Sequence, residues 1–406
     1  MTRLAPMTRL VLVSGEAAVP EVAAASALHA AGRGARTLLL AADDPHRRLD
    51  GLLGVRLADT PEKVSDGLWA SRIDEQQAFR EAAAALSGRL KSAFDLIGVE
   101  PLDQDELTAL PGTGQLALLR ALRQAVGSGE WDLVVAAAPP PAELTAALAL
   151  PEQLDRYLAR LLPEQRQAAR ALRPLLAAVA GVPMPAEWLY EARGWAAAEL
   201  AAAREVIESS ATSVRLTADA GNCSPDALSR ARAGLALFGH RLDCVVLHRA
   251  LPAAALASAD PWLAALAAAE RERLAALADE LGAGAGPGLG VPLLVGDQLA
   301  DGPVALARQL YGEGPGPEPA AAWPWTAEDR LAEDGVLLWR LAAPGADRTD
   351  LELMRRGDEL VVGLGPYRRI LSLPSALRRC TVAGAGLRDG ELTVRFAPDP
   401  ELWPRS

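Results

Sequence analysis

The stretch from residue 11 to residue 50 constrains the fold of this chain most. Leu10 to Val13 is a short apolar run, and Gly15 opens a tight loop after it. An alanine-rich segment of helical character, 22–31, comes next, and a second apolar run, 37–41, follows it. This order predicts a strand–loop–helix–strand unit of the size found in parallel sheets. The loop between a first strand and a first helix is where nucleotide phosphates usually bind.

This loop departs from a phosphate-binding loop at nearly every functional position. Such loops read G-x-x-x-x-G-K-[ST], in which the glycines expose N–H groups, the lysine neutralises charge and the hydroxyl holds Mg²⁺. At that spacing the chain has Gly15 and then Pro20, Glu21 and Val22. Proline has no N–H to donate, glutamate brings negative charge, and valine cannot bind a metal. Pro20 and Glu21 instead suit the first turn of a helix, which leaves N–H groups unpaired and favours an acid.

The unit resembles the start of the arsenite-pump ATPase family, which includes the targeting factor for tail-anchored membrane proteins. Members begin with G-K-G-G-V-G-K-T-T, followed by a helix, a strand and D-P-A-H-x-x-S-D. Here the first motif reads GEAAVPE, and Asp43, His46 and Asp50 keep the spacing of the second, whereas Asp44-Pro45 departs from it. The resemblance implies an α/β fold like that of P-loop NTPases, with a mostly parallel sheet and helices on both faces. It also makes Asp43 the water-orienting acid of any retained hydrolysis.

Two later strands end where members of this family contact the nucleotide. WDLVVAAA, at 131–138, aligns with Y-D-x-V-V-x-D-T-A-P-T-G, whose second aspartate holds Mg²⁺ behind the phosphates. Here Ala136 and the two alanines after it precede three prolines. The carboxylate that would hold Mg²⁺ is therefore missing. RLDCVVLH, at 241–248, ends in His248, where the resemblance implies an asparagine that contacts adenine. The histidine could stack on a base or donate a hydrogen bond, or it could be a plain surface residue.

Residues 151–214 are predicted to be almost wholly helical. The resemblance implies that they form a helical subdomain inserted in the ATPase-like domain. In the targeting factor, this region makes a groove for an apolar client helix. Apolar residues lie on more than one face of the predicted helices, and this pattern fits a groove as well as an ordinary bundle core.

The sequence pattern changes after residue 312. Segment 313–334 is predicted to be a linker, because its first part is rich in glycine, proline and alanine. Six runs of strand length follow between residues 336 and 396, with an Asp-Gly turn signal at 389–390. Their order resembles the α-crystallin domain of small heat-shock proteins. We therefore expect an ATPase-like domain over 1–312 and a small all-β sandwich over 335–398.

Composition narrows the range of partners. The 406 residues carry a formal charge of −11 with no basic block to offset it, so nucleic acid is not expected as a partner. The three cysteines lie far apart and form no C-x-x-C pair, so no metal site is expected. No apolar run reaches the roughly 18 residues of a membrane span, and the N-terminus does not read as a signal peptide. We therefore expect a cytoplasmic protein without an integral membrane span.

Two functions remain open at this point. The first is a pseudo-ATPase, which binds no cofactor and acts as a client-binding or scaffold protein. Its partner would be an apolar client segment, a second copy of the chain or an active paralogue. The second is an enzyme that hydrolyses ATP with Mg²⁺ and is coupled to membrane-protein targeting or anion transport. It would need one of four arginines near the loop as a phosphate donor: Arg33, Arg36, Arg47 or Arg48. A dinucleotide oxidoreductase is disfavoured, because the chain has no G-x-G-x-x-G at this loop.

Overall fold

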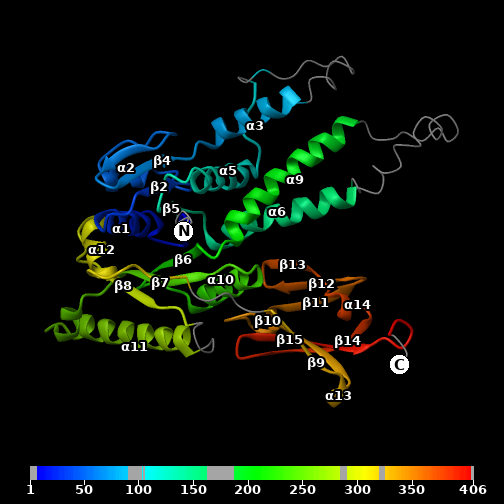
Figure 1. Cartoon of the computed structure of the whole chain (residues 1–406). Coiled ribbons are helices and arrows are strands. Elements are labelled where there is room, and N and C mark those ends of the chain that lie inside the picture. Colours follow the sequence, from blue (N-terminus) through cyan, green and yellow to red (C-terminus); the bar gives the residue numbers. More distant parts are fainter. Residues whose placement is uncertain are drawn as a thin grey trace, which may run out of the picture. The chain divides into compact units, whose positions relative to one another are not determined.

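The computed structural model describes residues 7–89, 103, 106–161, 187–283, 290–319 and 325–403. The chain divides into two compact units. The first contains residues 1–71, 131–145 and 210–406, and the second contains residues 72–130 and 146–209. The central sheet and the C-terminal strands therefore belong to the same unit (Figure 1).

The first unit is built on an eight-stranded sheet with the order β3-β4-β2-β5-β1-β6-β7-β8. Five of its strand pairs, from β2 across to β8, are parallel, and β3 runs antiparallel to β4. The central strands are buried along almost their whole length, as expected for a parallel sheet covered on both faces. The strands are β1 (Arg9–Gly15), β2 (Thr37–Ala41), β3 (Glu62–Ser65), β4 (Leu68–Arg72), β5 (Leu133–Ala137), β6 (Thr212–Asp219), β7 (Leu242–Ala250) and β8 (Leu293–Asp297).

Helices lie on both faces of this sheet, which confirms the predicted fold class. On one face, α1 and α12 pack in a single apolar core with side chains from β1, β2, β5 and β7. On the other face, the first turns of α10 lie beside Leu216 and Ala218 of β6. The helical segments of this unit are α1 (Val19–Gly32), α2 (Arg48–Leu53), α10 (Pro225–Leu237), η2 (Ala253–Ala257), α11 (Pro261–Ala283) and α12 (Gly302–Tyr311).

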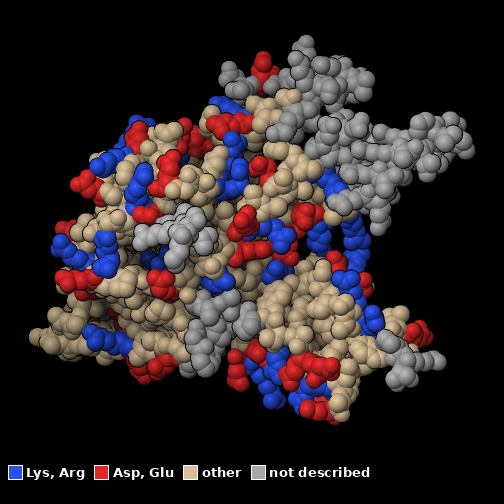
Figure 2. Space-filling model, viewed as in Figure 1, with Lys and Arg blue, Asp and Glu red and all other residues tan. Residues whose placement is uncertain are grey.

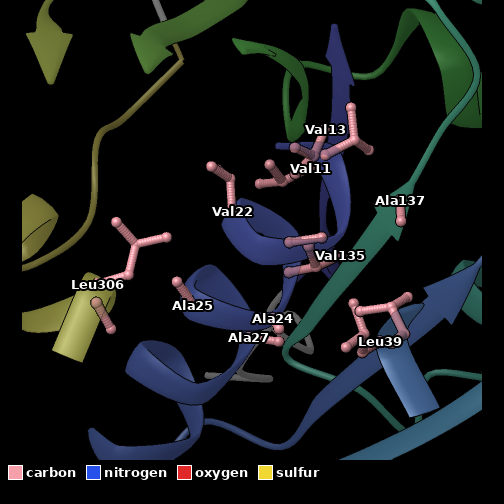
Figure 3. Packing of buried hydrophobic residues seen from close by; sticks show 14 of the residues in the cluster. Val11, Val13, Val22, Ala24, Ala25, Ala27, Leu39, Val135, Ala137 and Leu306 are labelled. Atoms are coloured by element: carbon pink, nitrogen blue, oxygen red, sulfur yellow. The ribbon is translucent and has the colours of Figure 1, made fainter. Parts of the chain in front are cut away.

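Alanine makes the packing of α1 on the sheet close. Figure 3 shows Val11 and Val13 of β1 and Val135 of β5 beside the alanine-rich turns of α1, with Leu306 of α12 on the other side of the helix. Residues 22–25 of α1 have no exposed surface at all. A helix with such short side chains can approach strands closely, and the burial of its apolar surface stabilises the unit.

The C-terminal strands form a sandwich of two antiparallel sheets, as predicted. One sheet has the order β14-β15-β10-β9, and the other has the order β11-β12-β13. Two of the elements, β9 and α13, lie within 313–334, the range expected to be a linker, and β9 pairs with β10. The elements are β9 (Thr326–Arg330), α13 (Leu331–Asp334), β10 (Val336–Ala342), η3 (Arg348–Asp350), β11 (Leu351–Arg356), β12 (Glu359–Leu364), β13 (Tyr367–Ser372), α14 (Ser375–Arg378), β14 (Cys380–Arg388) and β15 (Glu391–Pro398).

This sandwich shares its apolar core with α10 of the ATPase-like part. Ala233 and Leu237 of α10 belong to the same buried cluster as the inward-facing residues of the sandwich. The ring of Tyr367 lies so close to Gly234 that a Cβ atom there would be 2.5 Å from it. A glycine is therefore required on this face of the helix, because any side chain would push the sandwich away.

The second unit is helical in its described parts. Its helices are α3 (Glu75–Arg89), α5 (Thr113–Gly127), α6 (Pro141–Leu161), which begins in the first unit, and α9 (Glu187–Glu208). An ion pair of 3.0 Å joins Arg123 of α5 to Glu199 of α9. Of the region predicted as helical, 151–214, residues 162–186 lie outside the described part, and the helical prediction is wrong at its end, where β6 begins at Thr212. Among the described helices, none has the length and apolar content that a membrane crossing needs.

Candidate nucleotide site

The loop between β1 and α1 is short and runs directly into the helix. β1 ends at Gly15, α1 begins at Val19, and Pro20 lies in its first turn, as the sequence predicts. Ala18, just before the helix, adopts a left-handed conformation with φ of 61°, which is unusual for a residue other than glycine. No side chain caps the helix, and Glu21 supplies a negative charge in its first turn.

Contacts with β6 fix this loop in place. The hydroxyl of Thr217 donates a 2.6 Å hydrogen bond to the carbonyl oxygen of Ala17. A Cβ atom at Gly15 would lie 2.0 Å from the carbonyl oxygen of Thr217, so only glycine fits there. The one glycine of the phosphate-loop pattern that this chain keeps is therefore required for packing against β6.

Glu21 forms an ion pair in the place where a phosphate loop carries its lysine. Arg48 of α2 donates a hydrogen bond to Oε1 of Glu21, whose side chain is 12% exposed. The second carboxylate oxygen, Oε2, is buried without a hydrogen-bond partner among the described residues. The charge at this position is thus negative, and the neighbouring cation is already engaged.

The other altered positions are buried in the sheet and its helix. Val22 has no exposed surface and belongs to the core under α1. Ala136 is equally buried in β5, between Leu12 of β1 and Leu40 of β2. Neither residue has an oxygen atom in its side chain to bind a metal. Within the described ranges, no cluster of three or more His, Cys, Asp or Glu side chains is arranged to hold a metal ion.

Asp43 and Asp44 follow β2 and have different surroundings. Asp43 lies at the surface, but neighbouring atoms shield its carboxyl from part of the solvent. This desolvation, and then the charge of Asp44, raise the pKa of the Asp43 carboxyl. Asp44 is buried and accepts hydrogen bonds from the backbone N–H groups of Arg48, at 2.7 Å, and Leu49, at 3.0 Å. It therefore caps the start of α2, a role that the sequence reading missed. An aspartate just before an apolar helical segment is the signal that could have revealed it.

His248 lies near the end of β7 and is 9% exposed. The interpretation as a plain surface residue is therefore wrong. Its Nδ1 atom is buried without a hydrogen-bond partner in the described part of the chain, and it lies beside Gly296 of β8. Burial is the main cause that lowers the pKa of His248, so the ring is neutral at pH 7.

Comparison with known proteins identifies the family of this chain. Residues 8–281 match the profile of the anion-transporting ATPases. The chain belongs to that family. Residues 334–396 match a second profile, described as an HSP20-like domain found in these ATPases, so the predicted resemblance to small heat-shock proteins is confirmed as well.

The relatives of this ATPase-family chain match it over nearly its whole length. An uncharacterized protein of Streptomyces coelicolor is 50% identical over 398 residues, which cover 98% of this chain and 99% of the relative. A protein of Mycobacterium tuberculosis is 30% identical over 420 positions, with 94% of each chain covered. A protein of Aquifex aeolicus, provisionally named an arsenical pump-driving ATPase, is 22% identical, with 95% of this chain and 99% of the relative covered.

Membership of this ATPase family implies a site for ATP and Mg²⁺ at the β1–α1 loop. Two of the four arginines that could hold phosphates lie away from this loop. Arg33 follows the last residue of α1, at the end of the helix away from the loop, and donates to the carbonyl oxygen of Glu313. Arg36 lies over the rings of Trp69 and Trp131, at 5.3 and 5.5 Å. A helix of this length spans about 20 Å, so neither arginine reaches the loop.

The other two arginines of this family member are near the loop but are paired. Arg47 donates to Asp50 at 2.7 Å, and Arg48 donates to Glu21. The side chains present therefore do not fit a Mg²⁺-bound triphosphate.

Proposed function

We propose that this member of the anion-transporting ATPase family does not hydrolyse ATP and acts as a binding or scaffold protein. The observation that carries the proposal is the ion pair between Glu21 and Arg48 at the start of α1. A triphosphate at this helix would face a largely buried carboxylate, and like charges repel strongly where water is excluded. Arg48 could attract the phosphates only by leaving Glu21, whose charge would then be unpaired.

Three further differences from the family's nucleotide-binding residues support the same proposal, because each removes a group that would hold the phosphates or Mg²⁺. Pro20 removes a backbone donor from the first turn of the helix, and Val22 and Ala136 are buried apolar residues where a hydroxyl and a carboxylate would bind Mg²⁺. A single loss of this kind could be repaired by a neighbour. Repair of all of them would need several new polar groups at once.

Exposed apolar surface in the second unit supports a binding role. Leu116 of α5 is 48% exposed, and Tyr157 and Leu161 of α6 are 51% and 74% exposed. Large apolar side chains on a helical surface are suited to an apolar helix of another protein. We therefore propose an apolar client segment as the partner of this unit.

The sandwich offers a second kind of binding surface. β14 is the edge strand of its sheet, and residues 381–387 within it carry no charge. Val382 on this strand is 39% exposed. An edge strand presents unpaired N–H and C=O groups that can pair with an added strand, and charges would normally discourage this. The partner would be a second copy of the chain or an active paralogue.

The alternative is an active ATPase coupled to anion transport or membrane-protein targeting. The name of the Aquifex aeolicus relative and the position of Asp43 favour it. The raised pKa of Asp43 would suit a general base, since a base works best with a pKa nearer the working pH. This alternative still requires a phosphate donor at the loop.

Calorimetric titration of the full chain with Mg-ATP, together with a phosphate-release assay, separates the two functions. The proposal expects no saturable heat at about 1 mM nucleotide and no turnover above background. The control is the variant Pro20→Gly/Glu21→Lys/Val22→Thr, which restores the phosphate-loop residues. Saturable binding by the parent, or turnover that Asp43→Asn abolishes, would overturn the proposal.

The binding role is tested with a dye-labelled apolar helical peptide and fluorescence anisotropy. Replacing Tyr157 and Leu161 by glutamate should weaken binding about tenfold or more, because two charges would enter the apolar contact. Arg160→Glu, at an exposed position also on α6, is the control, because it changes the charge by the same amount. Binding that the glutamate variant leaves unchanged would rule out this surface.

A further inference from the structure

A cavity lies at the other end of the sheet from the phosphate loop. It holds about 260 Å³ and is lined by the first residues of β1 and β5, Arg9 and Leu133, and by the last turn of α1 with His29 and Arg33. Arg9 and Gly15 are the two ends of β1, so this cavity and the β1–α1 loop are separated by the whole strand. Nothing described above for the nucleotide site uses these residues.

A buried polar network forms one wall of this cavity. Arg215 of β6 has a side chain only 4% exposed and makes two hydrogen bonds to Asp243 of β7, at 2.7 and 3.2 Å. Its third nitrogen donates to the hydroxyls of Ser26, at 2.7 Å, and Tyr311, at 2.6 Å. The charge of Arg215 is therefore balanced by Asp243, and the network holds the wall rigid.

Residues 313–318, which we call the strap, cross one side of the cavity. Three side chains of the cavity hold it through its backbone carbonyl oxygens. Arg9 donates to Pro317 and Arg33 to Glu313, while His29 lies at hydrogen-bond distance, 3.0 Å, from the oxygen of Gly314. These acceptors are neutral, so they leave the charge of Arg33 unbalanced, whereas Arg9 also has two carboxylates within 4 Å, Asp243 at 3.6 Å and Glu318 at 3.5 Å.

Two arginines of the cavity keep hydrogen-bond donors that an anion could use. The Nε–H of Arg9 is buried and has no acceptor among the described residues, and the ion pairs of the described chain give Arg33 no carboxylate. The two acids of the lining are exposed residues. Asp132 accepts a hydrogen bond from the backbone N–H of Arg36, and Glu318, whose side chain is 77% exposed, pairs with Arg9 at 3.5 Å.

We propose that this cavity binds a small organic anion. Its carboxylate or phosphoryl oxygens would accept hydrogen bonds from Arg9 and Arg33, and its carbon atoms would contact Val11 and Val135. The volume corresponds to about eight or nine waters, which is the size of a short dicarboxylic acid. The site is independent of the phosphate loop and of the proposed loss of ATP hydrolysis.

Calorimetric titration of the full chain with succinate, and separately with inorganic phosphate, tests this inference at constant chloride concentration. We expect at least one of the two to bind saturably below about 10 mM, and the comparison tells carboxylate from phosphoryl recognition. Arg33→Gln should weaken that binding roughly tenfold, the usual effect of one charge-assisted hydrogen bond. The matched control is Arg308→Gln on α12, an exposed arginine that does not line the cavity.

Arg9→Gln provides the second variant, with its fold checked by thermal unfolding. It should also weaken binding, because it removes the buried Nε–H donor. If neither anion binds below about 10 mM, or if binding survives both substitutions unchanged, the cavity is not an anion site. Phosphate bound instead at the β1–α1 loop would be insensitive to both variants. Binding of Mg-ATP is measured in a separate titration, so the two proposals stand or fall separately.

Discussion

Arg369 of β13 donates a 2.8 Å hydrogen bond to the carbonyl oxygen of Leu237, the last residue of α10. The same guanidinium lies over the rings of Trp325, at 4.7 Å, and Phe238, at 5.4 Å. A cation at a helix C-terminus satisfies a free carbonyl and interacts favourably with the helix dipole. This arginine therefore joins the HSP20-like sandwich to the ATPase-like part of the chain.

Replacing Arg369 with alanine should lower the free energy of unfolding by about 1–3 kcal/mol, because a charged hydrogen bond and two ring contacts disappear together. Arg368→Ala, the neighbouring and exposed position on β13, is the matched control and should change stability by less than about 0.5 kcal/mol. Urea denaturation measures both. Equal effects of the two substitutions would contradict the role of Arg369.

The buried pair of Arg215 and Asp243 predicts a large effect of a single substitution. Asp243→Asn should cost about 3–5 kcal/mol, because it leaves the buried guanidinium without a counter-charge. The double variant Arg215→Met/Asp243→Leu should be less destabilised than the single one, since both charges are gone. Glu208→Gln, which breaks the exposed pair with Arg204, should cost no more than about 0.5 kcal/mol.

The close contact between Gly15 and Thr217 makes the loop intolerant of a larger residue. Gly15→Ala should destabilise the protein by about 2–4 kcal/mol, because its Cβ would overlap the backbone of β6. Gly32→Ala is the control, since nothing lies within 4 Å of a Cβ there. It should be neutral or stabilise by up to about 1 kcal/mol. Thermal and urea unfolding of both variants give the comparison.

Stability should fall as the solution is acidified below pH 6.5, partly because of His240. Burial, and then the nearby Arg369, lower the pKa of this histidine to about 3. Between that value and 6.5, the histidine binds a proton in the unfolded chain but not in the folded chain. The contribution of His240 to the free energy of unfolding therefore falls by up to about 1.4 kcal/mol for each unit by which the pH drops. His240→Gln should flatten the profile between pH 6.5 and about 4, whereas His46→Gln, at an exposed position, should leave its slope unchanged.

Restoring the phosphate-loop residues should lower the melting temperature in buffer without nucleotide. In Pro20→Gly/Glu21→Lys/Val22→Thr, the helix loses its proline in the first turn, a lysine faces Arg48, and a hydroxyl enters the core at Val22. The expected loss is about 2–5 kcal/mol. The single variant Glu16→Gln, in the same loop, is the control. A triple variant more stable than its parent would contradict the idea that Pro20 and Glu21 stabilise the first turn of α1.

The elements predicted well are those with a strong periodic signal. They include the apolar runs that became β1, β2, β5 and β7 and six of the seven strands of the sandwich. No tertiary information was needed for them, since burial alone selects their side chains. β9 was missed because three of its five residues are charged and the strand is exposed, so it forms through pairing with β10. Pairing of this kind depends on the partner strand and is invisible to local propensity.

The polar contacts were harder to predict, because they depend on which strands become neighbours. Arg215 and Asp243 each interrupt an apolar strand, which signals a buried charge, but only the adjacency of β6 and β7 makes them partners. The contacts of the strap with Arg9, His29 and Arg33 join residues that are far apart in the chain. At the candidate nucleotide site, the residue types were evident from the sequence, but the pairing of Glu21 with α2 was not.

The shared core at Gly234 and Tyr367 has a consequence for how such a chain is inherited. A domain that packs only against itself can be lost, duplicated or moved between genes without harm to its neighbour. Here the HSP20-like sandwich covers the apolar face of α10, so a gene that lost it would leave Ala233 and Leu237 facing water. The shared core therefore gives a physical reason for the ATPase-like part and the sandwich to be inherited together.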